Sequence, residues 1–222
     1  MPEVHYISNS FQGLTHTENQ DGYLILDEEN YYLFAVFDGV SMALNPRKGV
    51  DRAINFLKQE HYRFISDNAM RLKEMMHAVN QNILQAEYSE SLTTYALACF
   101  YKEEPTTLYY SNLGDSRIYY IENYKVIQLT VDDTLWPGSN ILTKCLGNKK
   151  LIPSDFREES FNLKHGVLFL ATDGCYGIWE RNRKEFLQVL NKFDLEEFQK
   201  SFEKNVKGEN PDDATYIFVQ IQ

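Results

Sequence analysis

Two apolar runs, far apart in the chain, end on the same dipeptide. The first, YYLFAVFDG, covers residues 31–39, and the second, VLFLATDG, covers residues 167–174. Each has the length and the aromatic and β-branched content of a buried strand, and each then delivers an aspartate followed by a glycine. Because a buried strand is a rigid support, we expect Asp38 and Asp173 to be held firmly at strand ends.

Further alternating or apolar runs predict more strands, and the short polar connectors between several of them favour antiparallel hairpins over long crossovers. The predicted strands are residues 22–26, 31–37, 94–101, 107–112, 117–121, 126–129, 167–171 and 215–221. Two helices are expected between the second and third of these strands. Asn45 and Pro46 supply an N-cap and a first-turn proline for one, and Ser66 or Asp67 is the expected cap of the other.

A further helical stretch is predicted over residues 183–207, ending at Gly208. Helices kept apart from mostly antiparallel strands indicate an α+β fold, in which two sheets pack together with helices outside. A chain of 222 residues with 43% hydrophobic content is long enough for one core, so we expect a single domain spanning residues 1–222.

The formal net charge of −10 opposes binding to phosphate backbones, and no basic stripe with interleaved aromatics offsets it. We therefore expect no nucleic-acid partner. No apolar run is long enough to span a membrane and the start of the chain lacks the pattern of a signal peptide, which predicts a cytoplasmic protein without membrane contact. Cys99, Cys145 and Cys175 show no metal-ligand spacing and are expected to be reduced core thiols.

Acidic residues stand beside small residues at several predicted strand ends. They are Asp21, Asp38, Asp115, Asp173, Asp212 and Asp213. Singly, each fits ordinary turn chemistry. If several converge they need cations, since two like charges about 4 Å apart cost roughly 4 kcal/mol at an effective dielectric near 20. Oxygen ligands without Cys or His favour Mg²⁺ or Mn²⁺, and two such ions would share and activate a water molecule.

The ordered motifs HTENQDG, FAVFDGVS, SLTTYALA, LGDSRIYYI, QLTVDD, LTKCLG, FLATDG and DDATYIFV resemble the type 2C metal-dependent protein serine/threonine phosphatases, of bacterial type, over essentially the whole chain. The resemblance implies a four-layer α-β-β-α sandwich with two Mn²⁺ or Mg²⁺ ions at one end. It also implies hydrolysis of phosphoserine or phosphothreonine by metal-bound water, on phosphorylated proteins and in opposition to a serine/threonine kinase.

The resemblance also implies roles for single residues. Asp21, Asp38, Asp173 and Asp212 match the metal ligands, with Asp38 bridging the two ions and the Gly39 carbonyl completing one coordination shell. Asp115 matches a ligand of a third, weaker metal site, for which a turn cap or a salt bridge to Arg117 is the alternative. Asn19 and Asp213 would support the ligands from behind, Asp213 standing where the family usually has Asn.

The sequence departs from the family pattern in three further places. His16 stands where an Arg usually takes the substrate phosphate, so we expect either a weaker phosphate contact there or a solvated loop residue. Val40, which follows Asp38-Gly39, cannot transfer a proton to the leaving group. Residues 130–146 replace a much longer flap, which predicts a more open site. Three functions stay open: a protein phosphatase, a phosphatase-like binding or regulatory module, and a phosphatase acting on a small phosphorylated metabolite.

Overall fold

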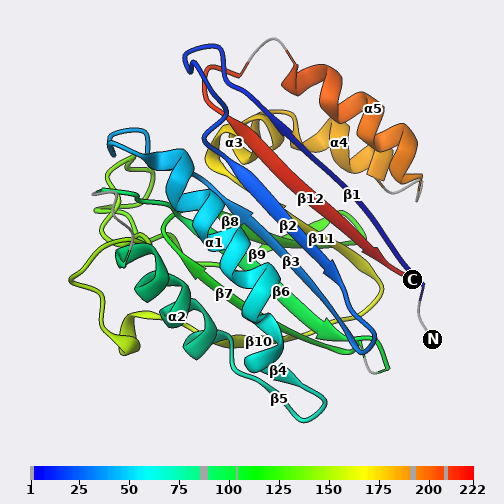
Figure 1. Ribbon diagram of the computed structural model, residues 1–222. Helices are drawn as coiled ribbons and strands as arrows, with labels where there is room; N and C mark the ends of the chain where they lie inside the picture. Colours follow the sequence, from blue (N-terminus) through cyan, green and yellow to red (C-terminus); the bar gives the residue numbers. More distant parts are fainter. Residues whose placement is uncertain (1–2, 86–89, 104, 191–193, 208–209) are drawn as a thin grey trace.

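The protein is described here from a computed structural model, which covers residues 3–85, 90–103, 105–190, 194–207 and 210–222. Two five-stranded sheets face each other, and helices cover the outer side of each (Figure 1). Neighbouring strands are antiparallel throughout both sheets. The α+β fold and the four-layer α-β-β-α arrangement implied by the sequence are therefore confirmed.

The first sheet has the strand order β1-β12-β11-β8-β9, and the second has the order β10-β7-β6-β3-β2. The strands of the first sheet are β1 (Val4–Phe11), β12 (Ala214–Ile221), β11 (Gly166–Ala171), β8 (Arg117–Glu122) and β9 (Lys125–Gln128). Those of the second are β10 (Glu159–Asn162), β7 (Thr107–Leu113), β6 (Tyr95–Tyr101), β3 (Tyr31–Phe37) and β2 (Gly22–Asp27). A small hairpin of β4 (Ile65–Ser66) and β5 (Ala69–Met70) stands apart.

Three apolar cores separate the four layers. The helices α1 (Pro46–Glu60) and α2 (Leu72–Leu84) pack on the second sheet, and α3 (Asp173–Arg181), α4 (Arg183–Leu190) and α5 (Leu195–Val206) pack on the first. A third core lies between the sheets and includes Phe34, Phe100 and Ile217. Burial of these apolar faces is the main force that fixes the sheets relative to each other.

All eight strands predicted from the sequence are present, each within one residue at either end. The alternation and the apolar content of the sequence were enough to predict these strands because most of them are central and largely buried. The sequence did not reveal β1, since its polar residues lie at the edge of a sheet and none of them is fully buried. It also missed β10, the hairpin of β4 and β5, and α3, whose first residue is Asp173.

The expected start of α2 is wrong. Ser66 and Asp67 do not cap α2, because the turn-forming sequence around them closes the hairpin of β4 and β5, and α2 begins only at Leu72. The helical stretch predicted over residues 183–207 is present as two helices, α4 and α5. The Asp194 side chain accepts a hydrogen bond from the Glu197 amide and caps the start of α5. Gly208, the expected stop, lies outside the described residues.

Strand ends bring the predicted aspartates to one edge of the sandwich. Gly22 at the start of β2 pairs with Phe37 at the end of β3, which places Asp21 and Asp38 next to each other beyond the strands. In the other sheet, β11 ends beside the start of β12, so that residues 172–173 and 212–213 lie close together. All three cysteines are buried and unpaired, and no described helix is long and apolar enough to cross a membrane.

Candidate active site

Aspartates from both sheets line one pocket at this edge. The pocket has a volume of about 560 Å³, and Asp38, Asp115, Asp173 and Asp212 all line it. Asp21 lies next to them with only 2% of its surface exposed. The structure thus brings together the five carboxylates that the sequence singled out as metal ligands; their coordination of metal remains a prediction.

The protonation behaviour of Asp38 shows how crowded these charges are. Burial raises the pKa of Asp38 well above its ordinary value, and the charges of four other aspartates raise it further. Those four, in order of effect, are Asp173, Asp21, Asp115 and Asp212. Burial likewise raises the pKa of Asp21, with Asp213 and Asp173 adding to it, whereas a hydrogen bond from Thr172 opposes the rise.

Asp115 and Asp173 respond in the same direction. Burial, followed by the charge of Asp173, raises the pKa of Asp115 from 3.8 to about 7. Burial, followed by the charge of Asp212, raises the pKa of Asp173 from 3.8 to about 6. A set of anions with raised pKa values is short of positive charge. The all-oxygen donor set therefore fits hard divalent cations such as Mg²⁺ or Mn²⁺.

The backbone around Asp38 is fixed on both sides. Its carbonyl oxygen accepts hydrogen bonds from the Thr94 amide and the Thr93 hydroxyl, each 2.8 Å long. The next residue must be small, because a Cβ atom on Gly39 would lie 2.7 Å from the carbonyl oxygen of Gln20. Packing against this neighbouring loop thus gives a reason for the glycine that holds with or without metal.

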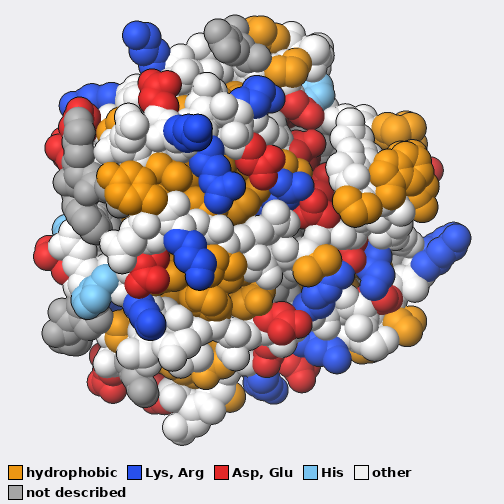
Figure 2. All heavy atoms as spheres, turned by 180° about the vertical axis from the view of Figure 1, so that it is seen from behind, with side chains coloured by type: hydrophobic (Ala, Val, Ile, Leu, Met, Phe, Trp, Pro, Cys, Tyr) orange, Lys and Arg blue, Asp and Glu red, His pale blue; other side chains and the backbone are white. Residues whose placement is uncertain are grey.

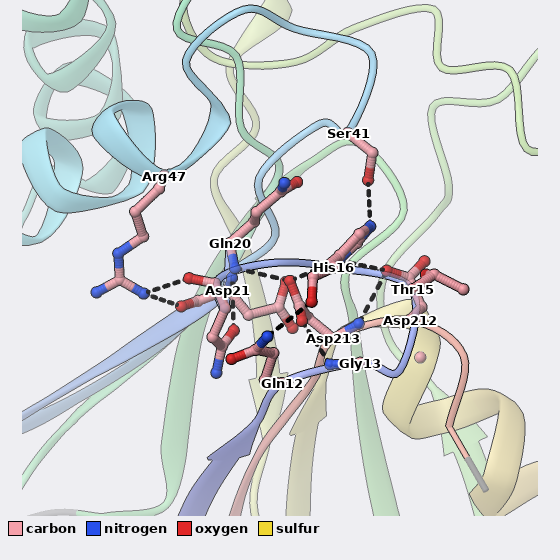
Figure 3. A network of polar contacts seen from close by, with 12 residues as sticks. Gln12, Gly13, Thr15, His16, Gln20, Asp21, Ser41, Arg47, Asp212 and Asp213 are labelled. Atoms are coloured by element: carbon pink, nitrogen blue, oxygen red, sulfur yellow. Dashed lines mark hydrogen bonds and ion pairs between the residues drawn. The ribbon is translucent and has the colours of Figure 1, made fainter.

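Two residues that the sequence analysis did not select hold Asp21. The Thr172 hydroxyl donates to the Asp21 carboxylate at 2.7 Å. Arg47 reaches from the first turn of α1 and donates to the Asp21 carbonyl at 2.5 Å and to the Asn19 carbonyl at 3.1 Å (Figure 3). The Asn19 side chain accepts a hydrogen bond from the Asp21 amide at 2.9 Å. The only local sequence signal for Thr172 is its position directly before Asp173.

The loop that carries Asp115 is anchored by the ion pair between Arg157 and Asp133. Gly114 has φ +95°, a conformation that favours glycine, and its amide donates to the Asp133 carboxylate at 3.2 Å. Arg157 binds the same carboxylate at 2.5 Å. Arg117, which was considered as a partner for Asp115, instead pairs with two other carboxylates, those of Asp132 and Glu180.

Comparison with known proteins agrees with this geometry. The model of the family described as Protein phosphatase 2C matches residues 15–215. The chain belongs to the protein phosphatase 2C family. No curated protein matches the sequence.

Solved structures share the protein phosphatase 2C fold at low sequence identity. A bacterial serine phosphatase has a TM-score of 0.83 and 21% identity, with 100% of this chain and 98% of that chain covered. The S. agalactiae serine/threonine phosphatase has a TM-score of 0.82 and 16% identity, with 99% of this chain and 100% of that chain covered. The Mycobacterium tuberculosis serine/threonine phosphatase PstP/Ppp has a TM-score of 0.77 and 17% identity, with 100% of both chains covered. At these identities the likeness establishes the fold.

Two departures of this phosphatase 2C chain from the family pattern meet in space. His16 Nδ1 lies 2.9 Å from a carboxylate oxygen of Asp213 and 3.6 Å from one of Asp212 (Figure 3). Asp213 is 2% exposed and also accepts the amides of Gly13 and Gln20. With 15% of its side chain exposed, His16 is not a solvated loop residue.

His16, Asp212 and Asp213 place one ligand atom each within 4.8 Å of one another, a spacing that also suits a metal ion. The carboxylate of Asp213 is already engaged by two backbone amides and the imidazole. A hydrogen-bonded pair therefore explains this cluster without an ion. The other imidazole nitrogen, Nε2, lies 3.4 Å from the hydroxyl of Ser41, which lines the carboxylate pocket.

The shortened flap of this phosphatase 2C chain forms a hairpin-like loop. The Thr143 amide donates to the Asp133 carbonyl at 2.7 Å, and the Leu135 amide donates to the Ile141 carbonyl at 2.9 Å. The loop exposes Leu135, Trp136 and Ile141, each by more than half of its surface. Its base is tied to the Asp115 loop through Asp133, so the short flap and the acidic cluster form one connected unit.

Proposed function

We propose that this protein is a metal-dependent phosphatase that removes phosphate from phosphoserine or phosphothreonine in proteins, as a single domain spanning the chain. The observation that carries the proposal is the convergence of Asp21, Asp115, Asp173 and Asp212 on Asp38. Membership of the protein phosphatase 2C family supports the same chemistry. The substrate would be a cytoplasmic phosphoprotein, the product of a serine/threonine kinase.

The residues that would hold two Mn²⁺ or Mg²⁺ ions are Asp21, Asp38, Asp173 and Asp212, together with the Gly39 carbonyl. Asp115 would take part in a third site. When bound, such ions neutralise the phosphate and activate water for attack on phosphorus.

The protein's own contribution is to hold these oxygens in place. Strand β3 and the bonds from Thr93 and Thr94 fix Asp38, while Thr172 orients the carboxylate of Asp21. Fixed ligands need no rearrangement when charge develops on the phosphate, which is how a preorganised site lowers a barrier. The burial that raises the pKa of these groups also strengthens their attraction for cations.

His16 would contact the substrate phosphate through Nε2, because its Nδ1 is engaged by Asp213. A single imidazole N–H offers less than the fork of an arginine, so we expect a higher KM than an arginine at this position would give. Kinetics of His16→Arg and His16→Ala test this assignment. A KM that neither substitution changes would remove His16 from the phosphate site.

The proposed activity is tested by manganese-dependent hydrolysis of p-nitrophenyl phosphate and of a phosphothreonine peptide. We expect both to be hydrolysed, and Asp38→Ala and Asp173→Ala to abolish turnover. Asp67→Ala, at an exposed turn that bonds Asn30, is the matched control and should retain it. Activity that persists in the first two variants would refute the mechanism. An inactive parent protein would favour the binding or regulatory module, and hydrolysis of the small ester alone would favour a metabolite substrate.

A further inference from the structure

The pocket that contains the acidic cluster is lined by two chemically different sets of side chains. Aspartates form one part of the lining, and apolar side chains, which we call the apolar wall, form another. The apolar members are Val40, Met42, Leu92, Ile141 and Leu142. They come from the loop after β3 and from the hairpin-like loop that replaces the long flap, apart from Leu92, which precedes β6. The loop after Asp38-Gly39 and the short flap over residues 130–146 therefore supply an apolar surface beside the site.

Part of this wall is open to solvent. Met42 is 96% exposed and Ile141 is 56% exposed. Single exposed apolar side chains are ordinary on protein surfaces, and Figure 2 shows several small groups of them between charged side chains. The pocket differs because its apolar side chains share a concave surface with the proposed metal ligands. Apolar surface in such a place is typical of a ligand-binding wall.

The charged groups of the pocket limit which residues can flank the phosphorylated residue of a substrate. Within the described part of the chain, the residues that line the pocket include no lysine, arginine or histidine. Acidic residues beside a phosphorylated side chain would find no cationic side chain among these lining residues, and the protein's net charge of −10 would repel them. Under the proposed function the carboxylates coordinate metal ions. Basic residues that flank the phosphorylated residue of a substrate would therefore find few carboxylates available for ion pairs.

Uncharged polar groups complete the apolar wall. Asn140, Thr143 and Asn148 line the same pocket, and their amides and hydroxyl match the donors and acceptors of a peptide backbone. The volume of about 560 Å³ falls in the range that holds a drug-sized ligand, larger than a phosphorylated side chain alone needs. The wall therefore has room and hydrogen-bonding groups for the residues that flank the phosphorylated one.

We propose that this pocket selects phosphorylated peptide segments with large apolar residues next to the phosphoserine or phosphothreonine, with Met42 and Ile141 as specificity-determining residues. The inference rests on the proposed function and specifies its substrate class. Met42 suits this role because its unbranched side chain adapts to differently shaped partners. Burial of an apolar side chain against the wall supplies the preference, since it removes apolar surface of both partners from water.

The test compares phosphothreonine peptides that are identical except for the two flanking residues, which are Leu, Ser, Glu or Lys. We expect kcat/KM for the Leu-flanked peptide to exceed that for the Ser-flanked peptide by about tenfold or more, mainly through KM. Ile141→Ser and Met42→Ser should each reduce this ratio several-fold. Ile152→Ser removes an isoleucine that is 57% exposed, nearly the same as Ile141, from outside the pocket and should leave the ratio unchanged.

The outcomes separate this inference from the proposed function. Hydrolysis of all four peptides at equal kcat/KM, or a preference for the Glu- or Lys-flanked peptide, would overturn the inference and leave the phosphatase activity standing. A ratio that is the same in Ile141→Ser, Met42→Ser and the parent protein would also overturn it. Hydrolysis of none of them would refute the proposed function, and the inference would fall with it.

Discussion

Replacing Asp115 by Asn should stabilise the metal-free protein at alkaline pH. Burial, followed by the charge of Asp173, raises the pKa of Asp115 from 3.8 to about 7 in the folded protein. This pKa lies above the value of about 4 in the unfolded chain, so the folded protein holds the proton more tightly. The stability of the fold with respect to this group is therefore highest below about pH 4. That contribution is lost as the pH rises toward 7. Asn keeps the shape of the side chain and removes the charge, so it removes the pH-dependent penalty.

The size of the effect follows from the same values. The interval between 3.8 and about 7 corresponds to a penalty of about 4 kcal/mol at pH 8, at about 1.4 kcal/mol per pH unit. At pH 5 the folded carboxyl is still protonated, and the penalty is about 2 kcal/mol. The stability advantage of Asp115→Asn over the parent protein should therefore grow by about 2 to 3 kcal/mol between pH 5 and pH 8.

Urea unfolding of chelator-treated protein at the two pH values measures this difference. Asp155→Asn is the control, because the pKa of Asp155 is shifted in the opposite direction. A hydrogen bond from the Ile152 amide lowers this pKa most, and a hydrogen bond from Lys144 lowers it further. Its stability relative to the parent protein should not rise between pH 5 and pH 8. An advantage of Asp115→Asn that is equal at both pH values would refute the reasoning. With excess Mn²⁺ the advantage should shrink, because the cation supplies the missing positive charge.

Three further predictions concern the supports of the site and the pH dependence of folding. Gly39→Ala should destabilise the fold by about 1 to 3 kcal/mol in urea unfolding, since its Cβ would overlap the carbonyl oxygen of Gln20; a change below about 0.5 kcal/mol would show that this loop yields. Arg47→Met should weaken Mn²⁺ binding in calorimetric titration by freeing the backbone of Asp21, and unchanged affinity would contradict that support. Burial lowers the pKa of His61, so stability is complete above about pH 6.5 and falls as the pH drops; His61→Gln should flatten this dependence, and an unaltered acid limb would exclude His61 as its source.

How well the sequence predicted the fold depended on where each element lies. Strands such as β3 and β11 have continuous apolar runs because both of their faces are buried, and local pattern finds them. Strand β1 pairs only with β12 at a sheet edge, where polar residues are tolerated, and its pattern is weak. The break between α4 and α5 depends on the single cap at Asp194, which the longer helical periodicity concealed.

The candidate site was predictable as a set of residues but not as a structure. Asp-Gly pairs at strand ends are local signals, and they identified Asp38 and Asp173. The groups that hold the aspartates act across long sequence separations. Arg157 binds Asp133 across 24 residues and Thr172 binds Asp21 across 151, and nothing in the local sequence of either pair specifies its partner. Such contacts follow from the packing of the two sheets, which only the tertiary structure supplies.

The contact between His16 and Asp213 shows why single departures from a family pattern can mislead. Taken separately, His16 in place of an arginine predicts a weakened phosphate contact, and Asp213 in place of an asparagine predicts a residue that supports the metal ligands. In the folded protein the two side chains lie 2.9 Å apart, although 197 residues separate them in the chain. The His16 imidazole donates a hydrogen bond to the buried carboxylate of Asp213. Without His16, this carboxylate would keep only the amides of Gly13 and Gln20 as partners. His16 and Asp213 therefore act as one hydrogen-bonded pair, and a change at either position should be judged together with the other.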